Sequence, residues 1–102
     1  MELVQILLPL RDGQSRDFPS ELYDKIASEM TERFGGVTAY TRTPAEGRWK
    51  PDGHKPEAED VVVLEIMVET LDREWWAQYR RGLERTFRQK NVIIRAQAIE
   101  QL

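Results

Sequence analysis

The sequence predicts an α+β protein of the ferredoxin-like class, in which two helices cover one face of a four-stranded antiparallel sheet. Three observations support this prediction. Four short segments are rich in β-branched and aliphatic residues, two longer segments carry apolar residues at helical spacing, and the order along the chain is βαββαβ. The chain has 102 residues, the length of one domain, so we assign residues 1–102 to a single ferredoxin-like domain.

The strands are predicted from short apolar runs that end at proline, glycine or polar residues. We place them at residues 2–10, 37–42, 60–69 and 92–99. Right-handed crossover connections put the first and third strands at the centre of the sheet and the second and fourth at its edges. The first and third strands are also strongly aliphatic, which agrees with a central position.

The first helix is predicted from apolar residues at every fourth position, namely Leu22, Ile26, Met30 and Phe34. Pro19 suits the first turn of a helix, and a capping residue is expected within 17–20. Gly35 and Gly36 follow the last apolar residue, and glycine readily adopts the left-handed conformation that closes a helix. We therefore expect the helix to end at this pair.

The second helix is predicted over residues 70–90 from another four-residue stripe, formed by Leu71, Trp75, Tyr79, Leu83 and Phe87. Thr70 or Asp72 can cap its start, and Asn91 is expected to end it. The stripe places Trp75 in the core and leaves Trp76 at the side of the helix.

The composition argues against several classes of protein. Lys and Arg number 15 against 18 Asp and Glu, a net charge of -3, so the chain lacks the basic character of a nucleic-acid binder. It has no cysteine and one histidine, which excludes thiolate chemistry and a multi-histidine metal site within one chain. No apolar run approaches the roughly 18 residues of a membrane helix, and no leader is evident. We expect a cytoplasmic protein with no metal, cofactor, nucleic acid or membrane partner.

The strands have a second face that the helices leave open, because side chains alternate along a strand. Apolar and polar side chains are mixed on this open face, and the apolar ones are Leu3, Leu7, Val61, Val63, Met67, Ile93 and Ile99. A patch of that extent is seldom left exposed on a soluble protein. We therefore expect a homodimer in which two sheets pack face to face.

The polar residues of the open face form a predicted small-molecule pocket, which consists of Gln5, Tyr40, Arg42, Glu65 and Arg95. A carboxylate buried near the middle of a sheet is costly unless it is paired, so we expect Arg42 or Arg95 to be the partner of Glu65. The alternative is an interface ion pair that has no part in chemistry.

The segment 43–60 is too long for an ordinary hairpin loop and contains three prolines and two glycines. Its Arg48, Trp49 and His54 can close over an anionic or aromatic small molecule. His54 is a candidate acid or base near neutral pH, although a single histidine in such a loop is more often solvent-exposed. Trp49 can equally anchor the loop to the rest of the protein.

The motif Phe34-Gly35-Gly36-Val37-Thr38, followed by Gly47-Arg48-Trp49, resembles small bacterial proteins of unknown function with an F-G-G-V-T then G-x-W pattern. The layout is similar to the dimeric α+β barrel superfamily, whose ferredoxin-like subunits pair through their sheets. This resemblance implies a homodimer. Members of the superfamily include cofactor-free monooxygenases, isomerases, haem-handling proteins and regulatory ligand-binding domains, and none of their catalytic patterns matches this sequence residue by residue.

Three functions remain open from the sequence. The first is a small-molecule binding protein with its pocket on the open face. The second is a cofactor-independent isomerase or oxygenase acting on a small aromatic or anionic metabolite, with His54 or Glu65 as base and Arg42 or Arg95 holding the anion. The third is a purely structural or assembly subunit.

Overall fold

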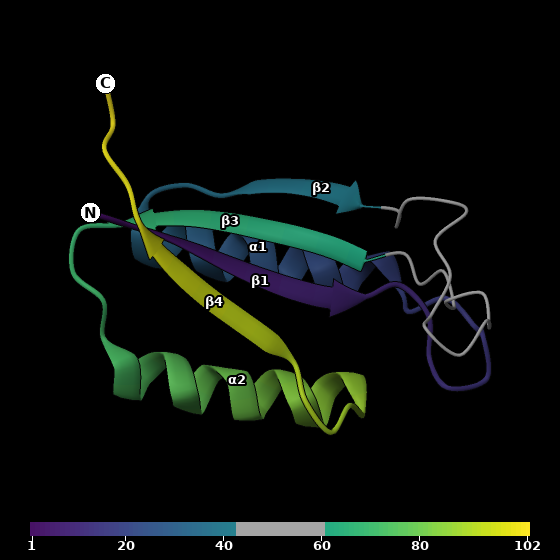
Figure 1. The fold of residues 1–102 in the computed structure, drawn as a ribbon. Coiled ribbons are helices and arrows are strands. Elements are labelled where there is room, and N and C mark those ends of the chain that lie inside the picture. The colour runs from purple at the N-terminus through teal and green to yellow at the C-terminus, as the bar shows by residue number, and fades with distance from the viewer. Residues whose placement is uncertain (43–60) are drawn as a thin grey trace, which may run out of the picture.

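The computed structural model describes residues 1–42 and 61–102, and it confirms the predicted α+β class (Figure 1). The strands form one antiparallel sheet in the order β2-β3-β1-β4, as the crossover argument predicted. The predicted site residues Arg48, Trp49 and His54 lie outside the described residues. The elements in chain order are β1 (Glu2–Pro9), α1 (Ser20–Phe34), β2 (Thr38–Arg42), β3 (Val61–Val68), α2 (Arg73–Phe87) and β4 (Ile93–Ala98).

The core lies between the two helices and one face of the sheet. Every second residue of β1 points into it, so Val4, Ile6 and Leu8 are buried while Gln5 and Leu7 between them are half-buried. Burying one such aliphatic side chain contributes roughly 2 kcal/mol. The buried cluster consists of Val4, Ile6, Leu8, Ile26, Met30, Leu64, Ile66, Val68, Trp76, Leu83, Phe87 and Val92.

Helix α1 ends where the sequence predicted. Gly35 is its C-cap in the left-handed region, with φ of 85°, and its amide donates to the Thr31 carbonyl at 2.8 Å. At the other end Pro19 occupies the N-cap position, which has no side-chain hydrogen bond. Both helices have 15 residues, and within the described ranges no helix is long and apolar enough to cross a membrane.

Helix α2 is capped by Asp72, whose carboxylate accepts a hydrogen bond from the Trp75 amide at 3.1 Å. A cap of this kind stabilises a helix by about 1 kcal/mol. The other end differs from the prediction at Asn91, because Arg88 adopts the left-handed conformation there, with φ of 53°. The chain thus leaves the helix at Arg88.

The prediction that Trp76 lies at the side of the helix was wrong. Trp76 is buried, 6% exposed, whereas Trp75 is half-buried and packs against the core. Four residues turn a helix through more than one full turn, so a strict four-residue stripe drifts by about 40° at each step. Measured around the helix axis, Trp76 lies about 20° from the buried Phe87, while Trp75 lies about 120° from it.

An aromatic cluster joins the two helices. Phe34 stacks on Trp76 with ring centroids 5.3 Å apart and meets Trp75 edge-on at 5.5 Å. Trp75 in turn stacks on Tyr79 at 5.0 Å, and the Arg33 guanidinium lies 4.1 Å from the Trp75 ring centroid. These contacts fix the end of α1, and therefore the start of the Gly35-Gly36 link, against α2.

Edge strand β4 is only partly covered by the helices. Alternation through residues 92–98 puts Ala96 and Ala98 on the helix side together with Val92 and Ile94, but both alanines are exposed. Val92 is buried, and Ile94 packs against the core. The difference arises because alanine side chains are too short to reach α2 from the outer strand of the sheet.

The Tyr79 hydroxyl donates a hydrogen bond to the Glu29 carboxylate at 2.9 Å. Burial, reinforced by this bond, raises the pKa of Tyr79 above its ordinary value of 10.0. Above about pH 10 the folded state therefore keeps a proton that the unfolded state loses, so the free energy of unfolding falls as pH rises. We expect the free energy of unfolding of Tyr79→Phe, measured by urea denaturation, to fall less steeply between about pH 9 and about pH 11 than that of the unmodified protein. An unchanged slope would contradict this assignment.

Candidate functional site

A row of polar residues crosses the open face of the sheet through all four strands. In the strand register Thr38 of β2 lies opposite Glu65 of β3, Glu65 lies opposite Gln5 of β1, and Gln5 lies opposite Arg95 of β4. We call these four residues the polar row. Gln5 and Glu65 are half-buried, and Thr38 and Arg95 at the two edges are exposed.

Gln5 connects the two charged members of the polar row. Its Nε2 donates to Glu65 Oε2 at 2.7 Å, and its Oε1 accepts from Arg95 Nε at 2.8 Å. Hydrogen bonds to charged groups are shorter and stronger than neutral ones, so these two bonds orient the amide with its oxygen toward Arg95 and its nitrogen toward Glu65. One Glu65 oxygen is used in this way.

Glu65 and Arg95, for which a direct ion pair was predicted, are joined instead through Gln5. Strands β3 and β4 flank β1 on opposite sides, which sets Glu65 and Arg95 two strand spacings apart, about 10 Å. The other predicted partner, Arg42, lies opposite Val61 at the far end of β2. Its position is therefore about 13 Å along the strand from Thr38, the residue opposite Glu65.

Mostly apolar residues flank the polar row on both sides. One neighbouring row runs through Tyr40, Val63, Leu7 and Ile93, and the other through Met67, Leu3 and Gln97. Among these, Tyr40, Met67 and Ile93 are exposed, at 41%, 48% and 47%. The open face thus presents large apolar side chains to solvent around a hydrogen-bonded polar centre.

A hollow of about 450 Å³ opens beside Glu65 on this face. Glu65 is the one charged side chain among its described lining residues. The other lining residues come from β1, β3, the end of α1, the link to β2 and the start of β2, and they are Leu3, Phe34, Gly35, Gly36, Val37, Thr38 and Met67. We call this space the Glu65 hollow.

The link from α1 to β2 forms one wall of the Glu65 hollow without closing it. A methyl group at Gly35 or Gly36 would meet no atom within 4 Å, so the space beside both glycines is open. Gly35 also needs its left-handed backbone to turn the chain out of α1. Phe34, which directly precedes Gly35, packs against Trp75 and Trp76 of α2 and so fixes the start of this wall.

The structure brings together some of the predicted site residues and separates others. Gln5, Glu65 and Arg95 form one hydrogen-bonded unit, with Tyr40 in the adjacent row. The sequence analysis missed the role of residues 34–38 as a wall of the hollow. The available signal was the glycine pair directly before a strand, where the backbone can be approached closely.

The arrangement suits a ligand with an apolar body and a cationic centre. The apolar walls favour burial of carbon surface, and the Glu65 carboxylate attracts positive charge. Within residues 1–42 and 61–102, no group of three or more His, Cys, Asp and Glu is placed to hold a metal ion.

Comparison with known proteins finds similarity in structure. No family model and no curated protein matches the sequence. A phage SAM lyase solved in complex with S-methyl-5'-thioadenosine aligns with 94% of this chain and 79% of its own, with a TM-score of 0.58 and 19% sequence identity. The phage SAM lyase in its apo state aligns with 94% and 78%, with a TM-score of 0.57 and 19% identity. At this level of identity the similarity establishes a shared fold.

The bridge through Gln5 predicts a non-additive effect on stability. Gln5→Leu leaves Glu65 and Arg95 without their common partner, and a half-buried group left unsatisfied costs roughly 1–3 kcal/mol. Replacing both sides of the Glu65 bond, in Gln5→Leu/Glu65→Leu, removes the polar groups together and restores most of this loss. Urea denaturation at neutral pH measures the free energy of unfolding of Gln5→Leu, Glu65→Leu and the double variant. A double variant whose loss of stability equals the sum of the losses in the two single variants would refute the bridge.

Proposed function

We propose that the protein binds a small organic molecule with a cationic centre in the Glu65 hollow, and that S-adenosylmethionine (SAM) represents this ligand class. The observation that carries the proposal is a single carboxylate, oriented by Gln5, at the wall of a mostly apolar hollow. The shared fold of a phage SAM lyase, one of whose structures contains S-methyl-5'-thioadenosine, supports the choice of SAM as the probe.

The charges of the polar row match those of SAM. The molecule carries a sulfonium and an ammonium cation, a carboxylate and a flat adenosine. A cation beside Glu65 gains a favourable electrostatic interaction that is strongest where water is partly excluded. Arg95 has guanidinium nitrogens beyond the Nε bonded to Gln5, and these can donate hydrogen bonds to the carboxylate of SAM. The adenosine then lies against the apolar wall of the Glu65 hollow.

A second copy of the chain is proposed to cover the open face as a homodimer. Tyr40, Met67 and Ile93 are exposed there in a single chain, and burying them would supply the hydrophobic driving force for association. Covering this face would also exclude water from the polar row, which strengthens the attraction between Glu65 and a bound cation.

Calorimetric titration with SAM and with S-adenosylhomocysteine tests the binding proposal. The two compounds differ in the sulfonium methyl group, and so in one positive charge. We expect SAM to bind about tenfold more tightly, a difference of about 1.4 kcal/mol, and Glu65→Gln to remove this preference. Glu69→Gln is the matched control, because Glu69 is exposed on the same segment and does not line the Glu65 hollow.

Equal affinity for the two compounds in the unmodified protein, or an intact preference in Glu65→Gln, would reject Glu65 as the cation partner. Absence of binding by both compounds would reject the ligand class. The purely structural alternative predicts this last result, with Glu65→Gln changing nothing except the oligomer.

Cleavage of SAM is the second candidate function, and the fold similarity to a SAM lyase is the observation that favours it. Liquid chromatography with mass spectrometry on incubated SAM measures it directly. Release of S-methyl-5'-thioadenosine by the unmodified protein at a rate well above that of Glu65→Gln would support an enzyme. Intact SAM at a protein concentration that binds it would support a binding protein.

A further inference from the structure

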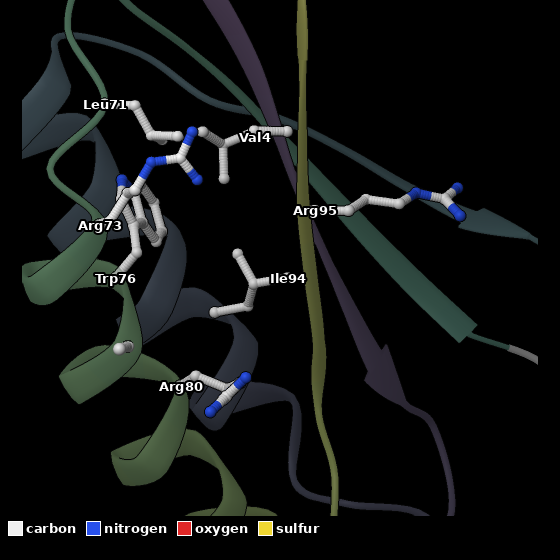
Figure 2. Close-up of a pocket in the computed structure, with 9 residues that line it drawn as sticks. Val4, Leu71, Arg73, Trp76, Arg80, Ile94 and Arg95 are labelled. Carbon is white, nitrogen blue, oxygen red and sulfur yellow. The ribbon is translucent and has the colours of Figure 1, made fainter.

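A second cavity lies on the other side of the sheet, between α2 and edge strand β4 (Figure 2). Its volume is about 270 Å³. We propose that this α2–β4 cavity binds a small organic anion with an apolar body, at a site separate from the Glu65 hollow. The lining residues are Val4, Leu71, Arg73, Trp76, Ala77, Arg80, Ile94, Arg95 and Ala96.

The cavity exists because the short side chains of β4 do not fill the space beside α2. Ile94 reaches toward the helix, as Figure 2 shows, but the next residue on that side, Ala96, is exposed and lines the cavity. On the helix, Ala77 is equally short. The buried Trp76 forms an apolar wall between the positions of Arg73 and Arg80.

Two arginines give the cavity its charge. Arg73 and Arg80 are exposed residues two helical turns apart on α2, a rise of about 10 Å. Figure 2 shows Arg73 extended beside Leu71 and Val4 at one end and Arg80 at the other. Among the described residues that line the cavity, none is acidic. Arg80 lies 3.9 Å from Glu84, an acid of the same helix that is outside the lining.

Arg95 lines the cavity from β4 but directs its charge elsewhere. Its side chain points away from α2 in Figure 2, and its Nε donates to Gln5 on the open face. The anion site is therefore formed by Arg73 and Arg80, and β4 separates it from the polar row. A substitution that abolishes binding at one site is therefore expected to leave binding at the other site intact.

The chemistry selects an anion attached to a flat or aliphatic body. A guanidinium group binds carboxylates, sulfonates and phosphates through paired hydrogen bonds, and it also packs well against aromatic surfaces. Trp76, Leu71 and Ile94 provide the carbon surface for the rest of the molecule. An inorganic anion uses the charge alone and leaves this surface unfilled.

Nuclear magnetic resonance titration with naphthalene-2-sulfonate tests the proposal. We expect saturable binding of one molecule per chain, with the largest shifts at the Trp76 indole N–H and at the Ala77 and Ile94 methyl groups. Naphthalene-2-sulfonamide has nearly the same shape without the charge, and inorganic sulfate has the charge without the body. Both are expected to bind at least about tenfold more weakly.

Variants separate charge from shape. Arg73→Gln/Arg80→Gln is expected to lower the affinity for naphthalene-2-sulfonate by about tenfold or more. Arg81→Gln/Arg85→Gln removes the same charge from α2 at residues that do not line the cavity, and it should bind as the unmodified protein does. Ala77→Leu fills the cavity while keeping a good helix former, and it should abolish binding with the helical circular dichroism retained.

Four results would overturn the proposal. The first three are equal affinity in the Arg73→Gln/Arg80→Gln protein, shifts that map to Leu3 and Met67 on the open face, and absence of saturable binding at millimolar concentrations. The neutral sulfonamide binding as tightly as the sulfonate would also overturn it, because the cavity would then recognise shape without charge.

Discussion

The alternation of β1 is the constraint on which the rest of the structure depends. This central strand places Val4, Ile6 and Leu8 in the core and Gln5, between them, at the middle of the open face. A shift of one residue in its pairing would move the whole apolar set to the open face. The burial of that set and the two hydrogen bonds of Gln5 therefore favour the same register.

The two sides of the sheet offer different chemistry as a result. The open face has a carboxylate beside an apolar hollow, whose wall is set by the Gly35-Gly36 link and by Phe34. The helix side has a smaller cavity with Arg73 and Arg80 at its ends. The aromatic contacts of Phe34 with α2 join the end of α1 to Trp76, a wall of the second cavity. One stack of rings thus supports both sites.

Local patterns in the sequence were sufficient for the two helices, the central strands and the end of α1 at Gly35, because each depends on near neighbours in the chain. The strand order followed from the crossover rule, which depends on how the elements are connected. The tryptophans show where such patterns fail, since a four-residue count ignores the drift of a real helix. The bridging role of Gln5 required the pairing of three strands, and the hollow beside Glu65 required the packing of α1 against α2. Residues far apart in the chain determine both features.

The central claim, that the open face binds the ligand beside Glu65, is tested most directly by the methyl resonances of the three methionines. Met67 lines the Glu65 hollow, whereas Met30 is buried in the core and serves as an internal reference. In a titration of methyl-labelled protein with SAM, we predict a saturable shift of the Met67 resonance with Met30 unchanged. A ligand that binds without moving the Met67 resonance, or that moves Met30 alone, would contradict this account.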